Sequence, residues 1–348
     1  MRLERRSETS RLALVLAPLA ALAFTLLLSS LLVAWAGAPV GQAYALLLEG
    51  GFGSRLALTE TLTRATPLIL TGLAAAVAFR AQLFNIGAEG QLYAGAMAAV
   101  AVAGASSTLP TALTFILMFI AAMLAGALLL LGPALMKSRL GVDEVVTTLL
   151  LNFIVLLAVS ALLDGPMKDP GAMGWPQSQS LAEDLQLSRL LERSRVHVGL
   201  LWALLLALAL WALLRYTTTG FEIRAVGASA EAAAFAGVPV RWVMVKVALL
   251  SGALAGLAGA VEVAGRTGYV TLDMSPGYGY SGIVIAMLAM LHPLAVVAAA
   301  VFVAGMLVSA DSMSRAVAVP TYIADVIVAV ALIAVLVATA FTQYRARL

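Results

Sequence analysis

Ten apolar runs, separated by short polar segments, are the feature that most constrains how this chain folds. They cover residues 12–35, 66–79, 92–105, 111–131, 145–163, 198–214, 243–263, 282–291, 293–309 and 322–341. A helix needs about 20 apolar residues to cross a bilayer core of about 30 Å, so several runs are too short to cross alone. With 62% of residues apolar and 11% charged, a soluble fold is excluded. We expect an all-α polytopic membrane protein with about ten transmembrane helices in one domain, residues 1–348.

The positions of the basic residues predict how these helices are oriented. The first run is longer than the roughly 7–15 residues of a signal-peptide core, so we interpret it as a retained helix. With both termini in the cytoplasm, most of the 21 Lys and Arg residues lie inside, as the positive-inside rule favours. This orientation gives a cytoplasmic tail at 1–11, an extracytoplasmic loop at 164–197 and a cytoplasmic loop at 215–242.

The loop at 164–197 is long enough to have structure of its own. Its first part places three prolines around Trp175, which predicts extended chain near the membrane interface. A short amphipathic helix on the membrane surface is predicted by the spacing of Leu181, Leu185, Leu190 and Leu191. The loop is either a simple connector or a docking surface for an external partner.

Several classes of function are excluded by residues that the sequence lacks. It has no cysteine and two histidines, so we expect no disulfide and no metal site. Its net charge of +3 is scattered, which gives no support for nucleic-acid binding. None of its three lysines belongs to a phosphate-binding G-x-x-x-x-G-K-[ST] loop, and no nucleophile has a nearby base in sequence. We therefore expect no catalytic residues.

The cytoplasmic loop contains the signals of a short, sharply ended helix within residues 217–242. Ser229 is a good N-cap, and Glu231 stabilises the positive end of the helix dipole. Gly237 and Pro239 end the helix, which is too short to be stable alone. Its small-residue surface is formed by Ala232, Ala233, Ala234 and Ala236. This surface either receives another protein or packs on its own bundle.

Four ordered motifs make the chain similar to a known family. They are G-F-x-I-R-A-V-G at 220–227, followed by A-A and A-G-V; FNIGAEGQ at 84–91; GVDEVVTTLLLN at 141–152; and PGYGYSGIVIA at 276–286. Together they resemble the permeases of ATP-binding-cassette (ABC) importers for nucleosides, simple sugars and branched-chain amino acids. FNIGAEGQ with EVVTTLLLN favours the nucleoside and simple-sugar permeases. One departure is Ser229, where the family usually has asparagine.

The resemblance implies partners on both sides of a bacterial inner membrane. A separate cytoplasmic ATPase binds ATP and Mg, so this chain itself binds no cofactor. The residues implied in coupling to that ATPase are Gly220, Arg224, Gly227, Ser229, Glu231, Ala232, Ala233 and Gly237. A second permease chain, identical or homologous, and an extracytoplasmic substrate-binding protein complete the assembly within membrane lipid.

Polar side chains at membrane depth are costly and usually face a cavity or a partner. They gather at two glycine-rich breaks, which we expect to be corresponding broken helices of an inverted repeat near the midplane. The predicted translocation path is lined by Asn85, Glu89, Gln91, Asn152, Ser275, Tyr278 and Tyr280. The alternative is that Asn85 and Glu89 only cap the broken helices. Glu262 and Asp325 stand as isolated polar residues.

Neutral hydroxyl and amide groups without a cationic cluster suit an uncharged, polyhydroxylated ligand such as a nucleoside or sugar. Two alternatives remain open: a self-sufficient, ion-coupled secondary transporter, and an ABC permease for branched-chain amino acids. Separately, Gly252, Gly256 and Gly259 predict close helix packing along one face of the helix at 243–263.

Overall fold

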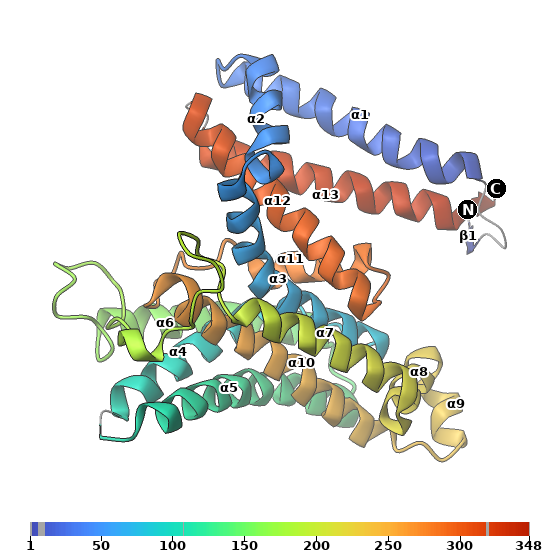
Figure 1. Ribbon diagram of the computed structural model, residues 1–348. Coiled ribbons are helices and arrows are strands. Elements are labelled where there is room, and N and C mark those ends of the chain that lie inside the picture. The colour runs from blue at the N-terminus through green and yellow to red at the C-terminus, as the bar shows by residue number, and fades with distance from the viewer. Residues whose placement is uncertain (1, 6–10, 107, 318–319, 348) are drawn as a thin grey trace. The chain divides into compact units, whose positions relative to one another are not determined.

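The computed structural model describes residues 2–5, 11–106, 108–317 and 320–347 and is almost entirely helical (Figure 1). The first half of the chain forms α1 Arg11–Trp35, α2 Val40–Phe52, α3 Arg55–Arg80, α4 Ala88–Ala105, α5 Thr111–Leu140 and α6 Glu144–Asp164. The second half forms η1 Glu183–Leu185, α7 Gly199–Tyr216, α8 Thr218–Ala228, α9 Ala230–Phe235, α10 Val240–Glu262, η2 Val263–Thr267, α11 Tyr278–Leu288, α12 Pro293–Val317 and α13 Thr321–Gln343. Strands β1 Arg2–Arg5 and β2 Tyr344–Arg347 pair antiparallel.

Each of the ten predicted spans overlaps a helix, so the all-α fold class is confirmed. Within the described residues, six helices are long and apolar enough to cross a membrane, and shorter apolar helices accompany them. The number ten is therefore not established. The six are α3, α5, α6, α7, α10 with its continuation, and α12.

Three helical segments were not expected. α2 lies outside every predicted span, and α8 occupies part of the predicted cytoplasmic loop. α3 begins at Arg55, eleven residues before the predicted start, through a threonine-rich stretch. Its polar residues fit because their hydroxyls donate back to the helix, as Thr59 does to Leu56 O at 3.0 Å and Thr66 to Leu62 O at 3.1 Å.

The chain divides into two compact units, Met1–Thr61 with Phe302–Leu348 and Leu62–Val301. In the first unit α1 packs along α13. α2 approaches α12 closely there, because a Cβ on Gly51 would collide with the backbone at Gly305. The hydroxyl of Thr61 donates to Gly51 O at 2.8 Å.

The second unit is centred on α10, which packs along α5 and α4 (Figure 1). Backbones meet where side chains are smallest. A Cβ on Gly252 would overlap the carbonyl oxygen of Gly126 on α5, and one on Gly259 would overlap that of Leu92 on α4. The predicted close packing along this face of α10 is confirmed.

The predicted amphipathic helix at 181–191 is wrong. The structure has only the single turn η1 there. Leu181 and Leu187 instead donate their backbone N–H groups to Gly268 O at 2.7 Å and Ala264 O at 2.8 Å. Because these bonds go to the chain after α10, the segment is held extended, and Leu181 and Leu185 are buried inside the protein.

Candidate functional site

The break between α3 and α4 is held by a row of side chains on α6. Glu144, Thr148 and Asn152 are four residues apart, so they lie on one face of that helix. The row accepts three backbone N–H groups of the break: Phe84 to Glu144 Oε1 at 3.1 Å, Ile86 to Thr148 Oγ1 at 3.2 Å and Gly90 to Asn152 Oδ1 at 2.8 Å. Non-helical backbone at membrane depth requires such partners. The motifs FNIGAEGQ and GVDEVVTTLLLN are therefore joined by hydrogen bonds into one structure.

The same α6 residues are positioned by further contacts. Asp143 caps α6 by accepting the N–H of Val145 at 2.7 Å. Lys137, in the last turn of α5, forms an ion pair with Glu144 at 2.5 Å and lies over the ring of Phe84. The loop between α5 and α6 is thus fixed to the start of the break.

Asn85 and Gln91 form a reciprocal amide pair inside the break. Asn85 Nδ2 donates to Gln91 Oε1, and Gln91 Nε2 donates to Asn85 Oδ1, both at 2.9 Å. Asn85 Nδ2 also donates to Ser251 Oγ on α10 at 3.1 Å, and the Ser251 hydroxyl donates to Ala74 O at 2.8 Å. The pair therefore links the break to α3 and α10.

Asn152 joins this first break, between α3 and α4, to the second break, which is residues 268–277 before α11. Its Nδ2 donates to Ile86 O at 2.8 Å and to the Tyr280 hydroxyl on α11 at 3.2 Å. The approach needs a glycine, because a Cβ on Gly90 would lie 2.9 Å from Asn152 Oδ1.

Glu89 forms a second link between the breaks. It accepts the N–H of Gly279 at 2.6 Å, and a Cβ on that glycine would collide with the backbone of Glu89. Ser275 Oγ accepts the N–H of Tyr278 at 3.0 Å, which organises the start of α11. The beginnings of α4 and α11, far apart in sequence, therefore lie against each other.

Arg266 is a residue of this region that the sequence reasoning missed. It lies on η2, a π-helical turn that continues α10. Its Nη1 donates to Glu262 Oε1 at 2.5 Å and to the Tyr278 hydroxyl at 3.1 Å. Glu262 is therefore not isolated, and a cation does lie beside the second break. The i, i+4 spacing of Glu262 and Arg266 was a usable signal.

The structure thus brings all seven predicted path residues into two connected clusters. Asn85, Gln91 and Asn152 are fully buried and bonded to neighbours, as the capping alternative describes. Tyr280 is the most exposed of the seven, at 39%. Path lining by these residues remains a prediction.

The predicted capping of the short helix at 229–237 is confirmed. Ser229 is the N-cap of α9, and its Oγ accepts the N–H of Ala232 at 3.2 Å. Gly237 follows α9 with a φ of +86°, and Pro239 then precedes α10. The Arg224 guanidinium donates to Leu214 O, which fixes α8 to the end of α7.

Three of the residues expected to take part in coupling face inward. Gly220 and Gly227 are in close backbone contact with Leu213 and Arg80, so neither accommodates a side chain. Ala233 is buried, whereas Ser229, Glu231 and Ala232 are exposed. Among the large apolar side chains of the loop at 215–242, Phe235 is the most exposed, at 97%, and the sequence reasoning missed it. Docking of another protein on this helix remains a prediction.

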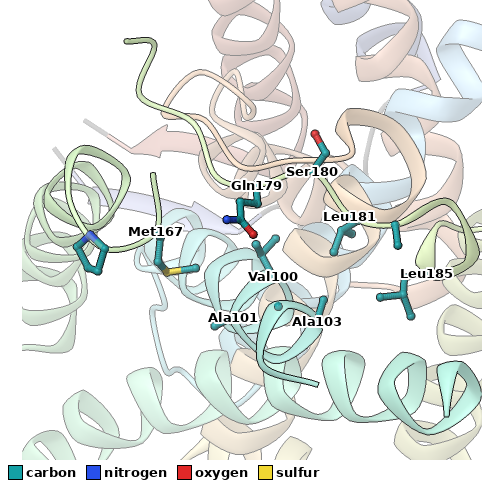
Figure 2. A pocket seen from close by; sticks show the side chains of 11 residues that line it. Val100, Ala101, Ala103, Met167, Gln179, Ser180, Leu181 and Leu185 are labelled. Carbon is teal, nitrogen blue, oxygen red and sulfur yellow. The ribbon is translucent and has the colours of Figure 1, made fainter. Parts of the chain in front are cut away.

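The segment at 166–185 borders a cavity of about 470 Å³ beside the end of α4 (Figure 2). Val100 and Ala103 of α4 line one side, and Met167, Gln179 and Leu181 line the other. The cavity shows that this segment is folded back on α4 rather than extended freely.

His197 ends the same segment and is buried with no hydrogen-bond partner for either ring nitrogen among the described residues. It packs against Gly265 of η2 and Gly199 at the start of α7. Burial lowers its pKa to about 4.

Paired helix breaks inside a bundle of apolar helices are typical of membrane transport proteins. The chain belongs to the family described as "Branched-chain amino acid transport system / permease component", which it matches over residues 57–336. It is a multi-pass membrane protein and a permease subunit of an ABC transporter.

Individual relatives carry more specific names. The guanosine ABC transporter permease NupP of Bacillus subtilis is 36% identical over 92% of each chain. The glucose ABC transporter permease TsgB13 of Haloferax volcanii is 37% identical over 87% of this chain and 82% of its own. The nucleoside ABC transporter permease NupB of Lactococcus lactis is 30% identical over 86% of this chain and 85% of its own. Membership of this group implies an ATPase and a substrate-binding protein as partners.

Proposed function

We propose that this chain forms the translocation path of an ABC importer for a nucleoside or simple sugar in the bacterial inner membrane, with both termini in the cytoplasm. The observation that carries the substrate proposal is the similarity to NupP, which extends over 92% of both chains. The glucose permease at 37% identity keeps a simple sugar in the proposal.

The coupling proposal rests on α8 and α9. An ATPase that binds ATP and Mg docks on α9 around Phe235, with Ser229, Glu231 and Ala232 exposed beside it. Movement of α9 is transmitted through α8 to the first break, because Gln82 Nε2 donates to Gly227 O at 2.8 Å. Gln82 precedes Asn85 by three residues, so this bond leads directly to the amide pair.

The path proposal assigns different tasks to the seven predicted residues. Asn85, Gln91 and Asn152 hold the breaks, and Tyr280 lies beside them, 39% exposed, with its hydroxyl accepting from Asn152. An aromatic ring with a hydroxyl suits stacking on a base or a sugar. The charge of Arg266 is balanced by Glu262, which agrees with an uncharged solute.

Outside the membrane, the folded segment at 166–185 is the proposed contact for the substrate-binding protein. One chain presents one α9, so a second permease, identical or homologous, stands beside it to serve a two-subunit ATPase.

Reconstitution in liposomes tests this function. Liposomes containing the chain, its ATPase, its partner permease and the binding protein are expected to accumulate guanosine or glucose only with ATP. Uptake of leucine instead would refute the substrate and leave the importer class standing. Uptake by the purified chain alone under a proton or sodium gradient would establish a secondary transporter instead.

A further inference from the structure

We propose that the end of the α5–α10 pair beside α8 contains a binding site for an anionic glycerophospholipid. A cavity of about 450 Å³ lies there, lined by residues of the last turns of α5 and the first turns of α10. Its apolar lining includes Leu131, Leu135 and Val245, and its charged lining is Arg139 and Arg241. No task in transport described above uses these residues.

Two lysines close to this cavity already have carboxylate partners. Lys137 is paired with Glu144, and Lys246 is paired with Glu222 at 3.1 Å. Within the part of the chain that the structure describes, the side chains of Arg139 and Arg241 have no ion pair and no hydrogen bond. Arg139 and Arg241 are both exposed beside one cavity, so their guanidinium groups are available to an anion. A guanidinium matches the oxygens of a phosphate in charge and geometry.

The position of Arg241 strengthens the attraction. It lies in the first turn of α10, a helix of 23 residues whose positive dipole end favours a negative group. Trp242 follows it, lines the same cavity and is 67% exposed. Tryptophan beside basic residues is typical of the level of the lipid headgroups.

The apolar part of the cavity favours a lipid over a free phosphate or an acidic protein. Leu131 and Leu135 continue the exposed apolar face of α5 formed by Leu124 and Leu128. An acyl chain on that face remains in hydrocarbon while its phosphate reaches the arginines. Basic pockets between transmembrane helices bind anionic headgroups in this way.

Lipid retention by the full-length chain in detergent tests the site. With phosphatidylglycerol and phosphatidylethanolamine offered in equal amounts, native mass spectrometry is expected to show preferential retention of phosphatidylglycerol. Each arginine near a headgroup is worth about one kcal/mol, so the double variant Arg139→Gln/Arg241→Gln is expected to bind phosphatidylglycerol roughly thirtyfold more weakly. The matched control Arg195→Gln/Arg215→Gln removes the same charge from exposed positions and is expected to keep the preference.

Two results would overturn the proposal. The double variant could keep its preference for phosphatidylglycerol, or the control could lose that preference to the same extent. If inorganic phosphate displaces the lipid at equal concentration, the site binds free phosphate and the acyl-chain assignment is wrong.

Trp242 gives an independent measurement that does not need the double variant to fold. Phosphatidylglycerol brominated on its acyl chains is expected to quench part of the tryptophan fluorescence, and Trp242→Phe removes that part. If brominated phosphatidylglycerol quenches the fluorescence of wild type and of Trp242→Phe equally, the site is refuted. A photo-crosslinker at position 242 that captures the ATPase or the second permease in the assembled transporter, and no lipid, assigns the surface to a protein instead.

Discussion

Replacing Asn152 with leucine tests the interpretation that this amide holds the helix breaks together. Leucine has the same branched shape but no polar atoms, so the packing of α6 is retained. The change removes the bonds to Gly90 N–H and Ile86 O, each 2.8 Å long, and the bond to Tyr280 at 3.2 Å.

The magnitude follows from two limits. Interhelical hydrogen bonds in membranes average about 0.6 kcal/mol, so three of them give roughly 2 kcal/mol. A buried backbone group without a partner costs about 1–3 kcal/mol, so two of them give up to roughly 6 kcal/mol. We expect Asn152→Leu to lower the free energy of unfolding by about 2–6 kcal/mol.

Reversible unfolding in mixed micelles of mild detergent and dodecyl sulfate measures this loss. The matched control is Phe153→Leu, because Phe153 is the next residue of α6 and is exposed. We expect the control to change the free energy by less than about 0.5 kcal/mol. A loss in Asn152→Leu no larger than in the control would refute the structural role and leave path lining as its explanation.

The remaining predictions concern α8, α9 and the segment at 164–197. Phe235→Ala is expected to leave folding unchanged and to weaken ATPase binding about tenfold or more, measured by surface plasmon resonance, with the exposed Met173→Ala as control. Gly227→Leu is expected to fail at the folding stage, seen as aggregation in size-exclusion chromatography, because its Cβ collides with backbone. The folded-state pKa of His197, about 4, lies below its ordinary value of 6.5, so the neutral form is the stable one. Stability is therefore complete above about pH 6.5 and falls toward pH 4 by on the order of 3 kcal/mol, measured by unfolding at several pH values. His197→Gln removes this dependence, and the exposed His292→Gln retains it.

Local signals in the sequence predicted local structure well. The N-cap at Ser229 and the left-handed stop at Gly237 depend on one or two neighbouring residues, and the structure has both. The first eleven residues of α3 were not predicted because threonines lower the hydropathy of this stretch. The hydroxyls of Thr59 and Thr66 are nevertheless satisfied by carbonyl groups of the same helix.

Features that depend on distant residues were harder to predict. The leucines at 181–191 have helical spacing, but their backbone partners lie at 264 and 268, about 80 residues away. The exposure of Phe235 depends on how α9 packs, which its own sequence does not specify. Arg266 was missed because its partners, Glu262 and Tyr278, belong to two different elements.

Polar residues in an apolar span have two uses, and spacing helps to distinguish them. A residue that lines a path has no required relation to other polar residues of its helix. A residue that supports a break must meet successive backbone groups, which demands polar positions at i, i+4 and i+8 beside a glycine-containing segment. Glu144, Thr148 and Asn152 have that spacing, and the break they meet contains Gly87 and Gly90. Such a row therefore predicts a supported break, even where each residue alone suggests contact with a solute.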